Sequence, residues 1–209
     1  MKNLSWVFAG LALGSVTGLG CAGSLVDPDP EGTVKPPAQL TILRLPTNAA
    51  PLFNDSVAFY AKNSRDAEGI IYFKTPSGER GEKFARLRIE EGGLLTRPDG
   101  TPFGANDSVL IVMKVTDPRL LLVEMSPAGL KFTANEPAEL ELEYEETDGD
   151  LDGDGDSGDD DDDEIEQQLA IWRQERPGDP FVKLGTVKTE GLREFEAKLS
   201  SFSRYAVAY

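Results

Sequence analysis

The densest group of chemically competent residues is an acidic segment in which aspartates alternate with small residues. Residues 148–156 read DGDLDGDGD, so an oxygen-bearing side chain recurs at every second position and a glycine stands at the sixth. Calcium loops place oxygen ligands at positions one, three and five and use glycine at position six for a sharp turn. The spacing therefore predicts a calcium site with these candidate ligands: Asp148, Asp150, Asp152, Asp154, Asp156 and Asp159.

The same segment departs from the EF-hand pattern at two positions. The twelfth position carries Asp159 instead of a bidentate glutamate, and the eighth carries Gly155 instead of an apolar residue. A second register that starts at Asp150 and ends at Asp161 fits no worse. Low-complexity runs of one charge are typical of solvated, disordered insertions. Two alternatives therefore remain for residues 146–164, a metal-binding acidic loop or a disordered insertion between strands.

A second chemically suggestive group is Ser201-Phe202-Ser203, which precedes the closing residues RYAVAY. Upstream, residues 127–132 read PAGLKF and residues 136–140 read EPAEL. In order and spacing, residues 105–209 resemble the ZU-five domain of netrin receptors, ankyrins and zona-occludens proteins, and its bacterial relatives. The resemblance implies a β-sandwich that serves mainly as an interaction module, with autoproteolysis in some members.

The self-cleavage implied by that resemblance lacks one essential group in this chain. In the family, a serine hydroxyl attacks the preceding carbonyl while a neighbouring histidine handles the proton. Phe202 and Ser203 match the motif, but Ser201 replaces the histidine, and the chain contains no histidine at all. A serine hydroxyl is a poor base near neutral pH. We therefore predict that the degenerate motif is inactive and that Phe202 packs into the core.

The absence of histidine also limits which enzymes the chain can be. Ser-His-Asp and Cys-His hydrolases, imidazole zinc sites and HExxH metalloproteases are excluded. Paired carboxylates of the kind used in glycoside hydrolysis are available, but nothing in the sequence singles out a pair. We expect a non-enzymatic protein without catalytic residues, and no cofactor other than Ca²⁺ at the acidic segment.

Negative charge is concentrated in one part of the chain. The formal net charge is −16, and residues 145–166 contain 10 Asp and 4 Glu without a Lys or Arg. Outside that segment, 23 acidic residues are balanced by 21 basic ones. No basic stripe exists that would neutralise phosphates, so a nucleic-acid partner is not expected.

The N-terminus has the pattern of a bacterial export signal. Lys2 precedes an apolar run, Leu4 to Val16, that is shorter than the roughly 20 residues of a spanning helix. The only cysteine, Cys21, follows Gly-Leu-Gly in a sequence that resembles a lipobox, whose cysteine is acylated before cleavage. We expect a signal peptide over residues 1–20 and a lipid on Cys21; cleavage nearby without a lipid is the alternative.

A flexible tether is expected over residues 21–39, because proline, glycine and charged residues dominate that stretch. The leading interpretation is a lipid-anchored interaction module of the bacterial cell envelope, at its periplasmic or surface face. Its partners would be the membrane, through the lipid on Cys21, and an unknown envelope protein or surface ligand. The alternative is a calcium-responsive adhesion or recognition module that binds Ca²⁺ through the aspartate-rich loop.

From Leu40 onward, short apolar segments alternate with turn residues, which predicts an all-β antiparallel sandwich. Residues 40–104 are expected to form an N-terminal β part of the sandwich or a small β subdomain. Residues 105–209 are expected to form the ZU-five-like β region that carries the acidic insertion.

Two patterns within these parts predict where individual strands are buried. Residues 109–115 (VLIVMKV) and 120–125 (LLLVEM) are nearly continuous apolar runs, as expected of strands buried on both faces. Residues 138–145 (AELELEYE) instead alternate, so we expect the apolar side chains on a dry face and four glutamates on a solvated one.

Overall fold

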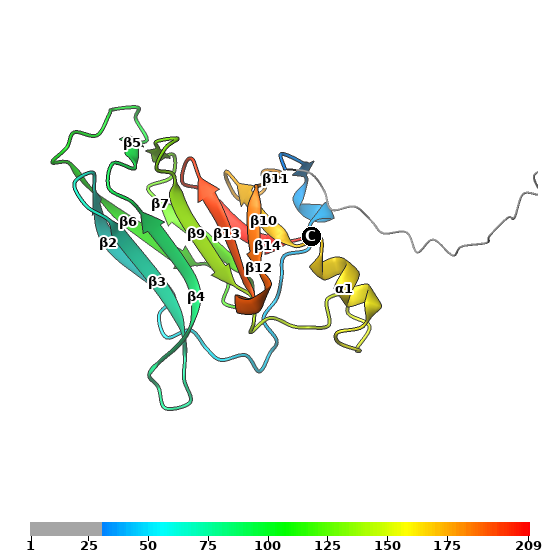
Figure 1. Ribbon diagram of the computed structural model, residues 1–209. Helices are drawn as coiled ribbons and strands as arrows, with labels where there is room; N and C mark the ends of the chain where they lie inside the picture. Colours follow the sequence, from blue (N-terminus) through cyan, green and yellow to red (C-terminus); the bar gives the residue numbers. More distant parts are fainter. Residues whose placement is uncertain (1–30) are drawn as a thin grey trace, which may run out of the picture.

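Two antiparallel β-sheets packed against each other form the body of the molecule, seen in Figure 1. The computed structural model describes residues 31–209. The seven-stranded sheet contains, in spatial order, β1 (Val34–Lys35), β11 (Phe181–Lys183), β10 (Ala170–Gln174), β14 (Arg204–Ala208), β7 (Leu122–Ser126), β6 (Ser108–Val115) and β2 (Ser56–Lys62). The five-stranded sheet contains β12 (Thr186–Thr189), β13 (Glu194–Leu199), β9 (Ala138–Glu143), β4 (Arg80–Ile89) and β3 (Ala67–Lys74). The predicted all-β sandwich is confirmed.

The remaining elements are short. A two-stranded sheet pairs β5 (Leu94–Thr96) with β8 (Lys131–Phe132). Two 3₁₀ turns, η1 (Pro37–Gln39) and η2 (Glu190–Leu192), and one helix, α1 (Asp160–Glu166), complete the fold. Among the elements of residues 31–209, no helix combines the length and apolar character needed to cross a membrane.

One core joins the two sheets, because the alternating side chains of their strands meet between them. Leu140 and Leu142 of β9 are completely buried and belong to the same cluster as Tyr205 and Val207 of β14. Residues 40–104 and 105–209 share this core, since β2 pairs with β6 and β4 pairs with β9. Residues 40–104 therefore contribute strands to the same two sheets as residues 105–209.

The expectation that residues 109–115 are buried on both faces is wrong for β6. Ile111 and Met113 are completely buried, but Leu110 on the opposite face is 46% exposed. The reason is its position, since β6 lies next to the terminal strand β2 and no further layer covers this face. For β7 the expectation holds at two residues, because Leu122 and Val123 are buried in clusters on opposite faces of the sheet.

Part of the stretch predicted to be a flexible tether is fixed to the sandwich. Val34 pairs with Val182 and Lys35 with Phe181, so β1 extends the seven-stranded sheet beyond β11. The 3₁₀ turn η1 follows directly. The tether prediction therefore fails for this part of residues 21–39, because a two-residue strand is stabilised by a long-range partner that no local pattern reveals. The predicted signal peptide, residues 1–20, and Cys21 lie outside the described residues.

A second, smaller core lies on the outer face of the seven-stranded sheet, under the segment that follows β1. Its centre is Trp172, which is completely buried and whose indole N–H donates to the carbonyl of Ala208 at 3.0 Å. Leu40 belongs to the same buried cluster, and the Lys35 ammonium lies 5.4 Å from the centre of the indole ring. The N-terminal segment is thus held by pairing, apolar burial and a cation–π contact.

The Ser-Phe-Ser stretch and the PAGLKF segment, remote in sequence, lie side by side. The N–H of Phe202 donates to the carbonyl of Leu130 at 2.9 Å, and the N–H of Gly129 donates to the carbonyl of Phe202 at 3.0 Å. Phe202 is completely buried, with its ring centre 4.9 Å from that of Phe132. Ser203 is also buried, and its hydroxyl has no hydrogen-bond partner among the described residues.

These contacts predict that truncations of two neighbouring residues change the free energy of unfolding by very different amounts. Phe202→Ala removes a completely buried ring and should lower the free energy of unfolding by about 3–5 kcal/mol. Ser203→Ala removes a buried hydroxyl that has no partner and should leave stability unchanged or slightly higher. Urea unfolding followed by circular dichroism measures both values. A large loss of stability in Ser203→Ala would contradict this description of the hydroxyl.

Candidate functional site

The acidic segment that follows β9 is folded around one buried carboxylate. Asp162 is only 3% exposed, and its two oxygens accept three backbone N–H groups from the loop before it. The donors are Leu151 at 2.6 Å, Asp152 at 3.3 Å and Gly158 at 2.6 Å. Burial alone would raise the pKa of Asp162, but these bonds outweigh it and lower the pKa. An ionised carboxylate therefore holds the loop together.

The short helix α1 forms within the run of acidic residues because their charges suit its N-terminus. Asp159 is the N-cap, and its carboxylate accepts the N–H groups of Asp161 and Asp162 at 3.1 and 3.0 Å. Four aspartates occupy the first turn, where the helix dipole favours negative charge. The run of like charges thus has a local structural role, which disfavours the disordered alternative.

Three carboxylates of this loop converge. One oxygen from each of Asp150, Asp152 and Asp162 lies within 4.8 Å of the others. Asp150 also accepts the N–H groups of Gly153 at 2.8 Å and Gly155 at 3.0 Å, and both glycines adopt positive φ angles of 84° and 97°. These bonds wrap the loop around Asp150.

The other predicted ligands do not join this group. The carboxylate of Asp148 accepts the N–H of Asp150 at 3.4 Å, that of Asp154 accepts the N–H of Asp156 at 2.8 Å, and Asp159 caps the helix. Asp162, which the sequence did not single out, takes their place. It lies within five consecutive aspartates, where only the onset of α1 distinguishes a buried carboxylate from its exposed neighbours.

Neighbouring negative charges raise the pKa of one of the three carboxylates, Asp152. The N–H of Asp154 lowers the pKa of Asp152, but partial desolvation and the charges of Asp154, Asp162 and Asp159 outweigh that bond. The pKa of Asp152 therefore lies above its ordinary value. Oxygen ligands of this kind and charge are the ones that Ca²⁺ takes in proteins, and a divalent cation would remove the repulsion.

A cavity of about 230 Å³ lies beneath the same loop. Its lining includes Asp162, Tyr144 and Arg193. The Tyr144 hydroxyl donates to Glu166 at 3.1 Å, and the Arg193 guanidinium lies 5.2 Å from the centre of the tyrosine ring. Arg193 is the one non-glycine residue between 31 and 209 with a positive φ, 46°. The cavity is thus lined by the acidic loop on one side and by the Arg193 guanidinium on another.

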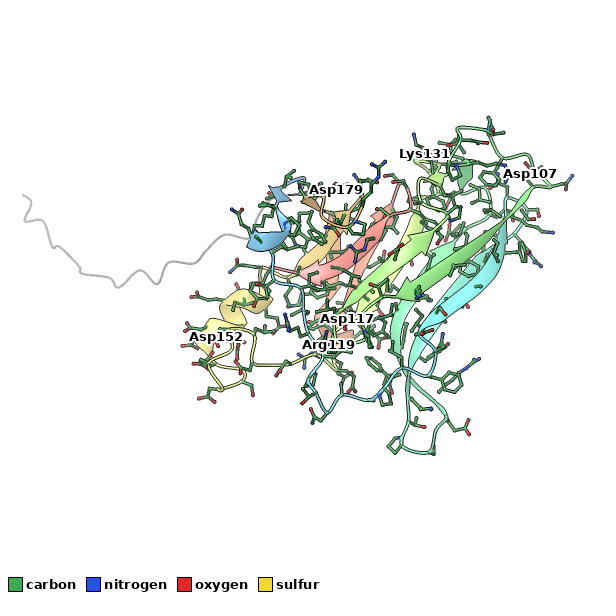
Figure 2. The ribbon with its side chains drawn as sticks, turned by 180° about the vertical axis from the view of Figure 1, so that it is seen from behind. Asp107, Asp117, Arg119, Lys131, Asp152 and Asp179 are labelled. Atoms are coloured by element: carbon green, nitrogen blue, oxygen red, sulfur yellow. The ribbon has the colours of Figure 1, made fainter. Side chains whose placement is uncertain are left out.

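Glu166, at the end of α1, connects the helix to β12. The Lys188 ammonium donates to its carboxylate at 2.9 Å, and this bond is the main reason that the pKa of Glu166 is lowered. Figure 2 shows Asp152 on the loop at the end of the sandwich that carries β1, with Asp107 and Lys131 at the opposite end. The acidic loop and the N-terminal strand therefore share one end of the molecule.

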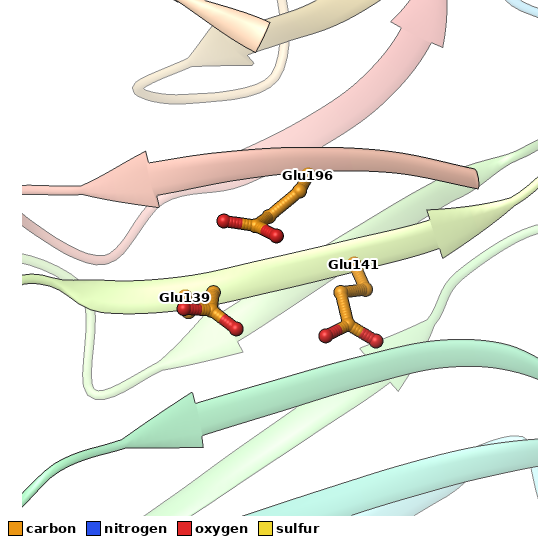
Figure 3. Close-up of side chains that lie close together, drawn as sticks. All are labelled: Glu139, Glu141 and Glu196. Carbon is orange, nitrogen blue, oxygen red and sulfur yellow. The ribbon is translucent and has the colours of Figure 1, made fainter. Parts of the chain in front are cut away.

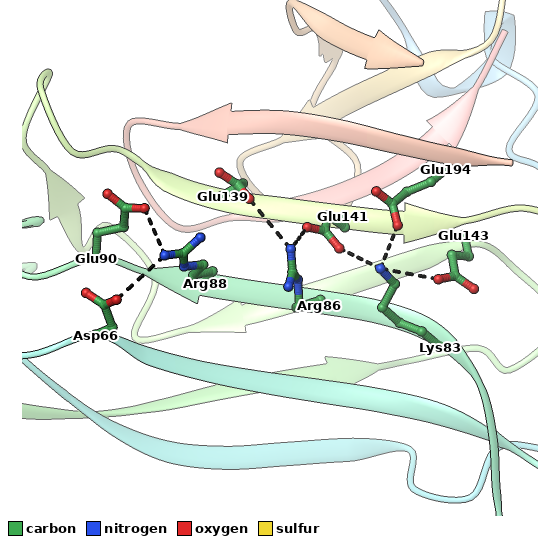
Figure 4. Close-up of polar contacts among 9 residues, drawn as sticks. All are labelled: Asp66, Lys83, Arg86, Arg88, Glu90, Glu139, Glu141, Glu143 and Glu194. Atoms are coloured by element: carbon green, nitrogen blue, oxygen red, sulfur yellow. Dashed lines mark hydrogen bonds and ion pairs between the residues drawn. The ribbon is translucent and has the colours of Figure 1, made fainter. Parts of the chain in front are cut away.

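A second group of charges covers the outer face of the five-stranded sheet, drawn in Figure 4. Lys83 of β4 lies between three carboxylates, with its ammonium 2.6 Å from Glu141, 2.5 Å from Glu194 and 3.2 Å from Glu143. Arg86 of β4 also donates to Glu141. The solvated face predicted for residues 138–145 is therefore wrong at Glu141, which is only 4% exposed because cations of the neighbouring strand enclose it.

Three glutamates of this face come close enough to be considered for a metal. Figure 3 shows Glu139 and Glu141 on β9 beside Glu196 on β13, with one oxygen of each within 4.8 Å of the others. Glu141 is already bound by Lys83 and Arg86, so a metal would have to displace these cations. The acidic loop is the better candidate, because its three carboxylates accept backbone N–H groups and form no ion pair with a Lys or Arg of residues 31–209.

Comparisons with known proteins return no match, whether with protein-family models, curated proteins or solved structures. The resemblance to the ZU-five domain therefore stays a prediction carried by the motifs alone.

The charged face predicts that substitutions of two glutamates on adjacent strands change the free energy of unfolding differently. Glu141→Gln leaves Lys83 and Arg86 without their shared buried partner, and should lower the free energy of unfolding by about 2 kcal/mol or more. Glu196→Gln should leave it unchanged or higher, because burial, reinforced by the charge of Glu139, raises the pKa of Glu196. Denaturant unfolding at neutral pH compares the two variants.

The pH dependence of the second variant follows from the direction of that pKa shift. Because the folded state binds the proton of Glu196 more tightly than the unfolded state, its ionised form costs stability above the raised pKa. The benefit of Glu196→Gln should therefore be complete at neutral pH and disappear as pH falls below the ordinary glutamate pKa. A benefit that grows on acidification would contradict the assigned direction.

Proposed function

We propose that the chain is an exported, lipid-anchored β-sandwich that presents a non-enzymatic interaction surface at the bacterial cell envelope. The observation that carries this proposal is the attachment of the N-terminal segment to the sandwich. Gly32 donates its N–H to the carbonyl of Lys183 at 2.9 Å, and β1 pairs with β11 immediately afterwards. Gly32 follows Cys21, the expected site of the lipid, by about ten residues.

This short spacing supports a particular orientation. An extended chain spans at most about 3.3–3.6 Å per residue, so the end of the sandwich with β1 and the acidic loop would lie within about 40 Å of a lipid on Cys21. The opposite end, where Figure 2 labels Asp107 and Lys131, would then lie farther from the membrane. A partner in the envelope would then contact the sandwich at a defined face.

The lipid anchor predicts that membrane attachment depends on the thiol of Cys21. Cys21→Ser should abolish incorporation of an alkyne-labelled fatty acid and move the protein from the detergent-extracted membrane fraction to the soluble fraction. Ser24→Ala, a change of similar size three residues away, should alter neither result. Fatty-acid labelling of the Cys21→Ser variant would contradict the proposed anchor.

In-cell crosslinking of the wild type and of Cys21→Ser tests the interaction module. An envelope partner should be captured more weakly by the variant, which lacks the lipid.

A second candidate function is a calcium-responsive adhesion or recognition module. The convergence of Asp150, Asp152 and Asp162 favours it, together with the raised pKa of Asp152. Outside the cytoplasm, extracellular calcium modules operate with dissociation constants of about 10⁻⁴–10⁻³ M. Binding would draw the three carboxylates together beside the cavity that Tyr144 and Arg193 line, so the metal would influence the shape of that surface.

Calcium binding has a direct thermodynamic signature. A hundredfold excess of Ca²⁺ over its dissociation constant should stabilise the fold by about 2.7 kcal/mol, measured by thermal unfolding. Asp152→Asn should remove most of this gain, because it neutralises one of the three converging carboxylates. Of the hydrogen bonds that hold the loop backbone, it affects only the one that the Asp154 N–H donates to Asp152. Asp156→Asn, the same change at an exposed residue of the same loop, should preserve it.

Two further observations distinguish a calcium site from general charge screening. Mg²⁺ at equal concentration should stabilise the protein less than Ca²⁺, because Mg²⁺ gives up its water shell reluctantly. The calcium affinity should fall as pH drops through the raised pKa of Asp152, because the proton competes with the metal. Equal stabilisation by both cations, or by all variants, would contradict a specific site.

A further inference from the structure

Residues 41–45, named here the anchor segment, join the N-terminal part of the chain to the main core. The N–H of Leu43 donates to the carbonyl of Val207 at 2.9 Å, and the carbonyl of Leu43 accepts the N–H of Leu121 at 2.9 Å. Leu43 and Leu45 are buried in the main core. The stretch of chain between the expected lipid and the main core therefore ends in this segment.

The first residue of the anchor segment lies at the end of this pairing. Thr41 and Tyr209 exchange two backbone hydrogen bonds, 3.0 Å long for the Thr41 N–H and 3.2 Å long for the Tyr209 N–H. Thr41 is exposed and Tyr209 is only partly buried. Exposed pairs at the end of a sheet open locally more often than pairs in its centre. A contact that braces Tyr209 would therefore keep this end of the segment closed.

The acidic loop provides that contact. The Tyr209 hydroxyl donates to the carbonyl of Leu151 at 2.6 Å, which places the C-terminus beside the loop in Figure 1. The N–H of Asp148 donates to the carbonyl of Arg44 at 3.0 Å. A cavity of about 90 Å³ remains between the loop and the anchor segment, with Asp150 in its lining. The loop thus holds the segment at two points, across space that is not completely filled.

The candidate calcium ligands surround the residue that braces Tyr209. Asp150 and Asp152 are the chain neighbours of Leu151, and the buried carboxylate of Asp162 accepts the Leu151 N–H at 2.6 Å. A cation bound among these three carboxylates would restrict the backbone of residues 150–152. This restriction would favour the loop geometry in which the Leu151 carbonyl accepts the Tyr209 hydroxyl.

We propose that the acidic loop is a calcium-controlled clasp on the anchor segment. With calcium bound, Leu151 holds the Tyr209 hydroxyl, and Tyr209 keeps Thr41 paired. Without calcium, this end of the segment opens locally more often. The clasp rests on the calcium-binding function proposed above and adds what the metal controls, namely how firmly the sandwich is fixed to the chain that leads to the expected lipid.

The coupling between metal and clasp acts in both directions. If calcium favours the closed clasp by a given factor, closing the clasp raises the calcium affinity by the same factor. Tyr209→Phe removes the hydroxyl that the Leu151 carbonyl accepts and keeps the ring that packs against the main core. Because couplings between sites typically amount to about 5- to 150-fold, this variant should bind calcium about fivefold more weakly or worse.

Hydrogen exchange of the full chain in detergent, resolved to single amides and measured at constant ionic strength, tests the clasp. Saturating Ca²⁺ should slow exchange of the Thr41 and Tyr209 N–H groups by about tenfold in the wild type, and Tyr209→Phe should lose this slowing. Tyr60→Phe is the matched control and should behave as the wild type, because it removes the hydroxyl of an exposed tyrosine on β2, at the sheet edge opposite to β1. Thermal unfolding without calcium verifies that both variants are folded.

Isothermal titration calorimetry of the same samples separates the clasp from the calcium site on which it rests. Calcium that binds to the wild type but slows exchange only within residues 148–166 would overturn the clasp and leave the calcium module intact. Equal slowing at Thr41 in the wild type and in Tyr209→Phe would also overturn the clasp. A wild type that binds no calcium would overturn both proposals.

Discussion

Crowded carboxylates must be balanced by cations or by N–H donors, and both the five-stranded sheet and the acidic insertion depend on this requirement. In the sheet, β9 lies at the centre with glutamates on its outer face, and β13 adds Glu194 opposite Glu143. Lys83 and Arg86 of β4 provide the balance, and Glu141 becomes buried between them. Without these cations the central strand could not carry its glutamates, and the core beneath it, built on Leu140 and Leu142, would lose its cover.

The acidic loop meets the same requirement by different means, because residues 145–166 contain no basic residue. Backbone N–H groups take the place of side-chain cations: three donate to Asp162, and two glycines donate to Asp150. This balance is incomplete at Asp152, whose pKa stays raised. The contrast explains why the sheet face is mainly a structural network and the loop is the candidate metal site, since Lys83 and Arg86 already bind Glu141 of the sheet whereas the three converging loop carboxylates accept only backbone N–H groups.

The sequence predicted a strand correctly where alternation alone determines burial, as at Leu140 and Leu142 of β9. It failed where the neighbours of a residue decide. Leu110 belongs to a continuous apolar run, yet it is exposed because β6 lies beside a terminal strand. Val34 and Lys35 look like tether residues, yet they pair with β11, almost 150 residues away. At the site, alternation identified Asp150 and Asp152, but Asp162 differs from the adjacent aspartates only in its place on α1, which composition does not reveal.

The sheet order also places the expected anchor and the acidic loop at one end of the molecule. β1, the end nearest to Cys21 in the sequence, closes one edge of the seven-stranded sheet, and the segment after it covers Trp172. The acidic loop is tied to the same region, because Tyr209 donates its hydroxyl to the carbonyl of Leu151 at 2.6 Å and Asp148 donates its N–H to the carbonyl of Arg44 at 3.0 Å. The other edge of this sheet, β2, lies six strands away. A lipid on Cys21 would therefore approach the sandwich from the side that carries the acidic loop, so that the proposed anchoring and calcium binding would act on neighbouring surfaces.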